Sequence, residues 1–283
     1  PAANVAQAAI AKGIPTLAEF FGQKFASTLL TLGKSADLVI ANNVLAHVPD
    51  LNDFIAGIRM ILKPGGVLTG EFPHLKNLFE QGQFDTIYHE HFSYFSLIGM
   101  ENALARHGLV IFDVQQLPTH GGSLRIFARR KEDTQLAITP AVAALRQVEL
   151  DAGYTTLETY QDFRRRVESI KFDLVSFLIK ARREGKSVAG YGAPAKGNSL
   201  LTYCGIRTDL LAYTVDRNPV KQGRYLPGVR IPVCAPEKIA ETKPDYLLIL
   251  PWNLRNEIIA QMAHIRAWGG QFVVPIPHLE ILP

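Results

Sequence analysis

The side chains best suited to chemistry stand in one run of four residues, Tyr88, His89, Glu90 and His91. Each can give or take a proton, and histidine, with an ordinary pKa of about 6.5, suits a general base at neutral pH. The run comes soon after a segment that we expect to be a strand with its carboxyl end at a ligand cleft. It is therefore a candidate for proton abstraction. The same residues also suit a structural loop, in which the rings pack and the imidazoles bond to backbone carbonyls.

The same run contains metal-ligand types, since His89 and His91 flank Glu90. Adjacent residues of a strand point to opposite faces, however, and no third ligand stands out. Cys204 and Cys234 are the only cysteines and do not form a CxxC pair. The sequence therefore predicts neither a metal site nor a disulfide framework in this chain.

A second candidate histidine, His47, follows a near-continuous apolar run over residues 36–41. Such a run is typical of a strand buried in a parallel sheet, and ligands bind beyond the carboxyl ends of such strands. His47 is therefore placed to contact a ligand that binds at this edge of the sheet.

A third candidate is the glycine-rich segment 187–199, SVAGYGAPAKGNS, which has the order strand, turn, helix start. Amides at a helix N-terminus, with Lys196 beside them, suit a diphosphate, although such a turn can also serve close packing alone. Asp216 ends the next predicted strand and suits either a ribose contact or turn chemistry. Trp252 suits either stacking on a base or core packing.

Strands and helices alternate along the whole chain. Helices are predicted over residues 4–12, 23–31, 50–62, 95–107 and 139–184, and strands over 14–17, 36–41, 67–72, 109–115, 123–130, 187–191, 212–216, 246–250 and 271–274. Asp50 suits a helix cap, and residues 109–130 suit an antiparallel pair. The pattern predicts two α/β domains.

Composition excludes several classes. The chain has 283 residues, 47% hydrophobic and 20% charged, which is typical of globular proteins. Its net charge of +4 is spread along the chain, so the sequence favours a small anionic ligand over nucleic acid. No apolar stretch reaches the roughly twenty residues of a membrane helix. We expect a soluble, cytoplasmic protein that binds neither nucleic acid nor membrane.

Two motifs carry a resemblance to a known family. Residues 36–48, ADLVIANNVLAHV, followed by Leu62 to Gly66, LKPGG, resemble the middle strands of class I methyltransferases. Residues 71–78, EFPHLKNL, and 83–96, QFDTIYHEHFSYFS, resemble the sugar C-methyltransferases that act on thymidine-diphosphate-linked 4-keto deoxysugars. The resemblance covers essentially the whole chain.

The resemblance implies specific roles. His91 is the expected base, and Tyr88, Glu90 and His47 complete the expected catalytic set. The expected cofactor is S-adenosylmethionine, beside Asn42 and Asn43. The remaining expected substrate-binding residues are Asn43, His89, Gly192, Lys196, Asn198, Ser199 and Asp216.

The beginning of the chain departs from that family. Its members start with a cysteine-rich zinc-binding domain and a glycine-rich turn that holds the cofactor, and we expect this chain to lack both. It is then either a fragment or a natural variant without methyl transfer. Zinc is expected only in the region before Pro1.

The predicted fold is α/β: a partial class I methyltransferase (Rossmann-like) domain followed by a second Rossmann-like domain. The expected boundaries are 1–135 for the first domain, 136–185 for a helical linker and 186–283 for a nucleotide-sugar-binding domain. The expected function is S-adenosylmethionine-dependent C-methylation of a nucleotide-linked keto sugar. The alternatives are a non-catalytic nucleotide-sugar-binding module and, less favoured because the glycine spacing departs from GxGxxG, a dinucleotide oxidoreductase. Sugar, carbon, nucleotide and oligomeric state are left open.

Overall fold

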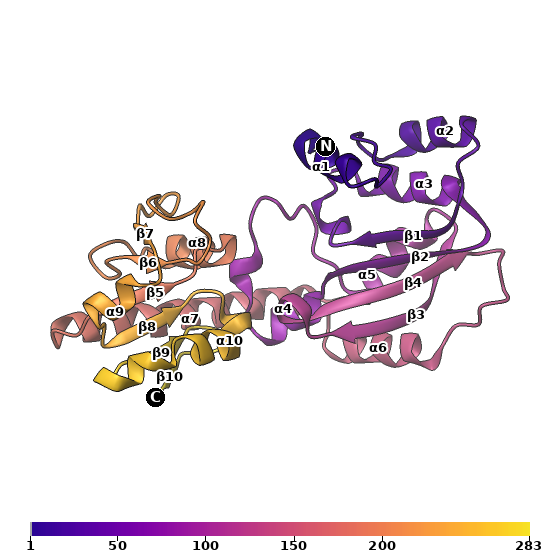
Figure 1. The fold of residues 1–283 in the computed structure, drawn as a ribbon. Helices are drawn as coiled ribbons and strands as arrows, with labels where there is room; N and C mark the ends of the chain where they lie inside the picture. The colour runs from indigo at the N-terminus through magenta and orange to yellow at the C-terminus, as the bar shows by residue number, and fades with distance from the viewer. Residues whose placement is uncertain (1) are drawn as a thin grey trace. The chain divides into compact units, whose positions relative to one another are not determined.

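The chain builds two sheets, each in its own unit (Figure 1). The computed structural model describes residues 2–283. Unit 1 contains the residues up to His74 together with His91–Ala152, and unit 2 contains Leu75–Glu90 together with Gly153–Pro283. The segment 75–90 therefore belongs to the second unit although the sequence on both sides of it belongs to the first.

Unit 1 has the sheet order β1-β2-β4-β3, with β1 and β2 parallel and the other pairs antiparallel. Its strands are β1 (Ala36–Asn42), β2 (Leu62–Pro73), β3 (Leu109–Leu117) and β4 (Ser123–Arg130), and its helices are α1 (Ala3–Ala11), α2 (Gln23–Thr31), α3 (Leu51–Ile61), α5 (Leu97–Ala105) and α6 (Pro140–Asp151), with the 3₁₀ turns η1 (Leu45–His47) and η3 (Thr119–Gly121). The predicted Asp50 cap is confirmed, because its carboxylate accepts a hydrogen bond from Asp53 N at 2.9 Å.

Unit 2 has the sheet order β10-β9-β8-β5-β6-β7, parallel except for the edge strand β10. Its strands are β5 (Val188–Tyr191), β6 (Thr214–Val215), β7 (Val233–Cys234), β8 (Tyr246–Ile249), β9 (Gln271–Val274) and β10 (Glu280–Leu282). Its helices are α4 (Leu75–Glu80), α7 (Leu157–Arg183), α8 (Ala195–Cys204), α9 (Lys238–Thr242) and α10 (Arg255–Gln261), with the 3₁₀ turns η2 (Phe84–Thr86), η4 (Trp252–Leu254) and η5 (Ala263–Trp268).

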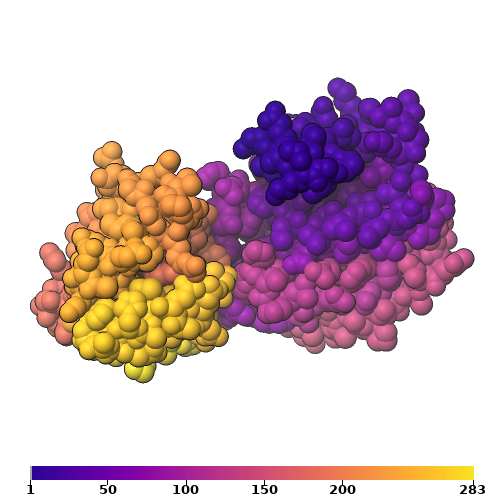
Figure 2. Space-filling view, viewed as in Figure 1, coloured from indigo at the N-terminus to yellow at the C-terminus, as the bar shows by residue number. Residues whose placement is uncertain are grey.

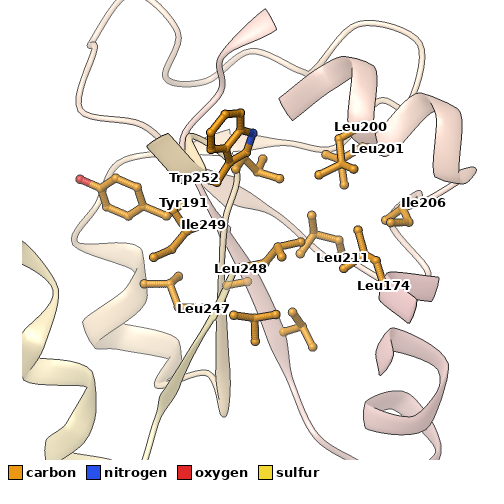
Figure 3. Packing of buried hydrophobic residues seen from close by; sticks show 14 of the residues in the cluster. Leu174, Tyr191, Leu200, Leu201, Ile206, Leu211, Leu247, Leu248, Ile249 and Trp252 are labelled. Atoms are coloured by element: carbon orange, nitrogen blue, oxygen red, sulfur yellow. The ribbon is translucent and has the colours of Figure 1, made fainter. Parts of the chain in front are cut away.

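The two helices predicted as a linker belong to the cores of different units. Val142 and Leu145 of α6 are buried in the unit 1 core. Ile170, Leu174 and Leu178 of α7 are buried in the unit 2 core, as Figure 3 shows for Leu174. The predicted boundaries 1–135, 136–185 and 186–283 therefore differ from the observed ones, because the apolar faces of both helices are buried against their own sheets rather than spanning a gap.

Two local predictions at the front of the chain are wrong. Residues 14–17 form no strand. Strand β1 is not buried, since Leu38 and Ile40 are 54% and 63% exposed. Its physical position explains this: within residues 2–283, β1 is the edge strand and pairs only with β2. The nearby N-terminal residues, indigo in Figure 2, lie on the outside of unit 1 and include Phe20, 80% exposed.

Candidate functional site

The carboxyl end of β1 in unit 1 carries two exposed asparagines, Asn42 and Asn43. Asn43 has a left-handed backbone with φ of 53°, a conformation that asparagine adopts more readily than most residues. Its backbone N–H donates a hydrogen bond to Glu71 O of β2 at 2.7 Å. The chain thus turns sharply at the sheet edge and continues into η1, which ends at His47.

His47 and His91, the two histidines singled out in the sequence, lie against each other. Their ring centroids are 4.8 Å apart with an interplanar angle of 68°. The backbone holds this arrangement, because Phe92 N donates to Ala46 O at 2.7 Å. Tyr94 adds a third ring, 5.8 Å from that of His91. The arrangement can supply a proton acceptor and a hydrogen-bond donor at one point.

The far end of the His91 loop is anchored by a buried carboxylate from α6. Glu149 accepts hydrogen bonds from Leu97 N at 2.7 Å and Ile98 N at 2.9 Å, at the start of α5. The same carboxylate lies 2.7 Å from His74 Nε2, and both side chains are fully buried. Since a negative charge is favoured at a helix N-terminus, Glu149 fixes the point where the loop enters α5.

Glu71 is a buried acid to which the sequence assigned no role. It is 5% exposed and accepts hydrogen bonds from Arg125 Nη2 at 2.7 Å and from Thr119 Oγ1 at 3.0 Å. Strand register places Asn42, Glu71 and Arg125 in one row across β1, β2 and β4. An acid at the end of an apolar strand was the signal that could have found this row.

The boundary between the units falls inside the predicted catalytic run. Tyr88, His89 and Glu90 belong to unit 2, and His91 belongs to unit 1. His89 and Glu90 are exposed, and Tyr88 is half-buried. Their roles stay predictions.

In unit 2, the glycine-rich turn has the predicted order of strand β5, turn and helix α8. Gly192 has φ of 93°, and a Cβ there would lie 2.5 Å from Pro251 Cδ, so the position requires glycine. Asp216 lies beside the turn, and its Oδ2 accepts from Ala193 N at 2.8 Å and from Lys221 Nζ at 3.4 Å. Its carboxylate therefore supports the turn directly.

Three further residues that were predicted to bind substrate lie in the first part of α8. Asn198 Oδ1 is buried and has no hydrogen-bond partner within residues 2–283. Ser199 Oγ donates back to Ala195 O at 3.3 Å. Lys196 Nζ donates to Asn253 Oδ1 at 2.9 Å and lies 4.5 Å from the centre of the Trp252 ring.

Trp252 is a core residue rather than an open stacking platform. It is 6% exposed and lies at one end of the apolar cluster drawn in Figure 3. Its indole Nε1 donates to Oδ2 of the fully buried Asp85 at 2.8 Å. Burial raises the pKa of Asp85 to about 7, although the Trp252 hydrogen bond and the charge of Lys196 act in the opposite direction. Burial likewise lowers the pKa of Lys196, and the charge of Asp85 raises it in part.

Residues 2–283 contain no group of three or more His, Cys, Asp or Glu side chains placed to hold a metal ion. No helix among them has the length and apolar character needed to cross a membrane.

Similarity to known proteins defines the class. A family described as the C-methyltransferase C-terminal domain matches residues 118–277, and a family described as a methyltransferase domain matches residues 4–114. The chain belongs to the family of S-adenosylmethionine-dependent sugar C-methyltransferases. Its predicted resemblance and fold class are confirmed.

A particular relative is the C-methyltransferase NovU of Streptomyces niveus, which is 37% identical over 282 residues. That match covers 100% of this chain and 67% of the relative, so the chain spans about two thirds of the relative's length.

Solved structures show only distant likeness. A possible histamine N-methyltransferase of Thermotoga maritima is 19% identical, with 46% of this chain and 71% of that chain covered and a TM-score of 0.37. Magnesium protoporphyrin IX methyltransferase of Synechocystis, solved with S-adenosylhomocysteine, is 19% identical, with 36% and 48% covered and a TM-score of 0.28. Scores this low carry no argument about function.

Proposed function

We propose that the protein methylates a carbon beside the ketone of a nucleotide-diphosphate-linked keto sugar. The contact between His47 and His91 beyond the end of β1 is the observation that carries the proposal. Removing a proton from such a carbon requires a base for the proton and a donor for the oxygen of the enolate, and paired imidazoles supply both functions.

His91 takes the proton from the carbon beside the ketone, and the electron pair of the broken C–H bond moves into the enolate. His47 donates a hydrogen bond to the enolate oxygen. Tyr88 and Glu90, close neighbours of His91 in the sequence, orient the sugar, with His89 as a further contact. The proton then passes from His91 to solvent.

S-adenosylmethionine, when bound, supplies an electrophilic methyl group. The end of β1 fits such a ligand, because Asn42 and Asn43 expose polar side chains there. Asn43 is also close in sequence to His47 and is assigned a substrate contact. Both asparagines hold polar parts of the ligands in place.

Unit 2 binds the nucleotide diphosphate. The glycine turn, the start of α8 and the ammonium of Lys196 favour negative charge. Asn198 Oδ1 adds a buried acceptor with no partner in the described chain, which suits a ligand N–H or O–H group. Asp216 supports the glycine turn through Ala193 N, and Ser199 lies one helical turn into α8. A cytoplasmic location fits the two free cysteines, Cys204 and Cys234. We propose no nucleic-acid or membrane partner.

The test is deuterium exchange at the carbon beside the ketone, because this step needs no methyl donor. The protein is incubated in D₂O with a thymidine-diphosphate-linked 4-keto deoxysugar, and label is read by NMR. Replacing His91→Asn should slow exchange by about 10²- to 10⁴-fold, the usual contribution of a general base. His107→Asn, just beyond the carboxyl end of α5, is the matched control and should exchange like the unmodified protein.

Two results would contradict the proposal. Exchange at an unchanged rate in His91→Asn would remove His91 as the base. Tight binding of the sugar nucleotide with no exchange in the unmodified protein would favour the non-catalytic binding module. Methyl transfer itself is read by mass spectrometry after S-adenosylmethionine is added.

A further inference from the structure

Asp85 of η2 is an acid inside unit 2 that the proposed reaction does not use. Its side chain is fully buried, and η2 packs against α8. One carboxyl oxygen, Oδ2, accepts the Trp252 indole hydrogen bond. The other, Oδ1, has no hydrogen-bond partner among residues 2–283. Burying a carboxyl group with one oxygen left without a hydrogen bond is costly.

The Trp252 ring connects this acid to Lys196. The indole edge bonds to Asp85, while the face of the ring lies 4.5 Å from Lys196 Nζ. The ammonium also donates to Asn253, the residue after the tryptophan. A continuous set of contacts thus runs from a buried carboxyl to the cation at the start of α8.

Other charged groups around Asp85 do not compete with Lys196. From α8, the Cys204 thiol has its pKa raised to about 12 by burial, so it stays neutral, and Tyr203 packs near Phe84. From α7, Lys171 lies over the Tyr203 ring.

The remaining charges on a neighbouring element offset each other. Lys76 and Glu80 of α4 form an ion pair at 2.6 Å. Lys196 is consequently the cation whose charge acts on the Asp85 carboxyl, as the causes of its raised pKa also indicate.

We propose that Asp85 is a positioning residue of the unit 2 anion site, which holds Trp252 and Lys196 in place and takes up a proton when a diphosphate binds to Lys196. The inference rests on the proposed function, since it needs a diphosphate at Lys196. Its physical basis is charge balance. The ammonium favours the ionised carboxyl, and a bound diphosphate cancels that field. The carboxyl then favours its protonated form, so proton and diphosphate binding reinforce each other.

The probe is thymidine diphosphate glucose, whose diphosphate is esterified on both sides and does not titrate near neutrality. Calorimetry at pH 7 in two buffers of different ionisation enthalpy gives the number of protons taken up on binding. We expect a fractional uptake by the unmodified protein, and an affinity that falls about threefold or more between pH 6 and pH 8.

Asp85→Asn keeps an acceptor for the indole and removes the titrating group. It should bind without proton uptake and with an affinity that does not change over this pH range, tighter than the unmodified protein at pH 8. Asp209→Asn, an exposed acid of the same unit, is the control and should keep the uptake.

A second measurement needs no ligand and no variant. The indole N–H of Trp252 should shift in NMR spectra with a midpoint near pH 7, because it bonds to the titrating carboxyl. Adding the probe should move this midpoint upward. The indole of Trp268, which bonds to Pro244 O, is an internal reference and should not follow.

The outcomes separate the two proposals. No binding of the probe would overturn nucleotide binding by unit 2, and this coupling with it. Binding with no proton uptake, or with the same uptake in Asp85→Asn, would overturn the role of Asp85 alone and leave the proposed function standing.

Discussion

Replacing Asp85 by asparagine should change the pH dependence of stability. The free energy of unfolding of the variant, compared with that of the unmodified protein, should become more favourable as pH rises. In the unfolded chain this carboxyl ionises around its ordinary pKa of 3.8, whereas burial raises the folded pKa to about 7. The unfolded state therefore holds fewer protons between these values. Stability from this group is complete below 3.8 and is lost as pH rises to about 7.

The size of the effect follows from the two pKa values. At about 1.4 kcal/mol for each pH unit, the whole loss is roughly 4 kcal/mol, and more than half of it falls between pH 5 and pH 8. Asparagine does not ionise and loses nothing. The difference in unfolding free energy between Asp85→Asn and the unmodified protein should thus grow by roughly 2 to 3 kcal/mol over this interval.

Urea unfolding followed by tryptophan fluorescence measures this difference, because Trp252 and Trp268 both lie in unit 2 with Asp85. Asp209→Asn should follow the unmodified protein at every pH. Parallel stability profiles for Asp85→Asn and the unmodified protein would refute the reasoning, since they would mean that the buried carboxyl ionises at the same pH in both states.

Three other outcomes are expected. Glu149→Gln should destabilise unit 1 by about 1–3 kcal/mol in thermal unfolding, because a buried charge-assisted cap of two amides is weakened. Gly192→Ala should destabilise unit 2 by about 1–3 kcal/mol in urea, because alanine is strained at φ of 93° and its Cβ meets Pro251. With a thiol reagent at pH 8, Cys204 should react far more slowly than Cys234, because burial raises the pKa of its thiol to about 12; equal rates would contradict this.

Local signals in the sequence were sufficient for elements whose cause is local. The helix over residues 23–31 and the cap at Asp50 were predicted correctly, because both depend on neighbours within one turn. The apolar run 36–41 predicted a strand correctly but predicted its burial wrongly. The burial of a strand depends on the elements that lie beside it, and the residues of the strand alone do not specify those elements.

Candidate residues were predictable where chemistry alone marks them, and contacts were not. His47 and His91 stood out by type, yet only the fold brings their rings together. The hydrogen bond between Asp85 and Trp252 joins residues that are 167 positions apart in the sequence. Nothing in the sequence predicted that these two side chains would be partners. Glu71 was missed because its partner Arg125 comes from a strand inserted beside β2.

Asp85 and Tyr88 lie in the same segment of unit 2, residues 75–90, so the contacts of Asp85 bear on the position of Tyr88. Asp85 precedes Tyr88 by three residues, and its hydrogen bond to Trp252 ties η2 to η4, the turn that follows strand β8. The backbone that carries Tyr88 toward its predicted role is thus fixed to the same tryptophan that lies against Lys196. A change that frees the Trp252 indole should therefore weaken diphosphate binding and slow deuterium exchange together. If such a variant slowed exchange but left the diphosphate affinity unchanged, the positions of Tyr88 and Lys196 would not both depend on Trp252.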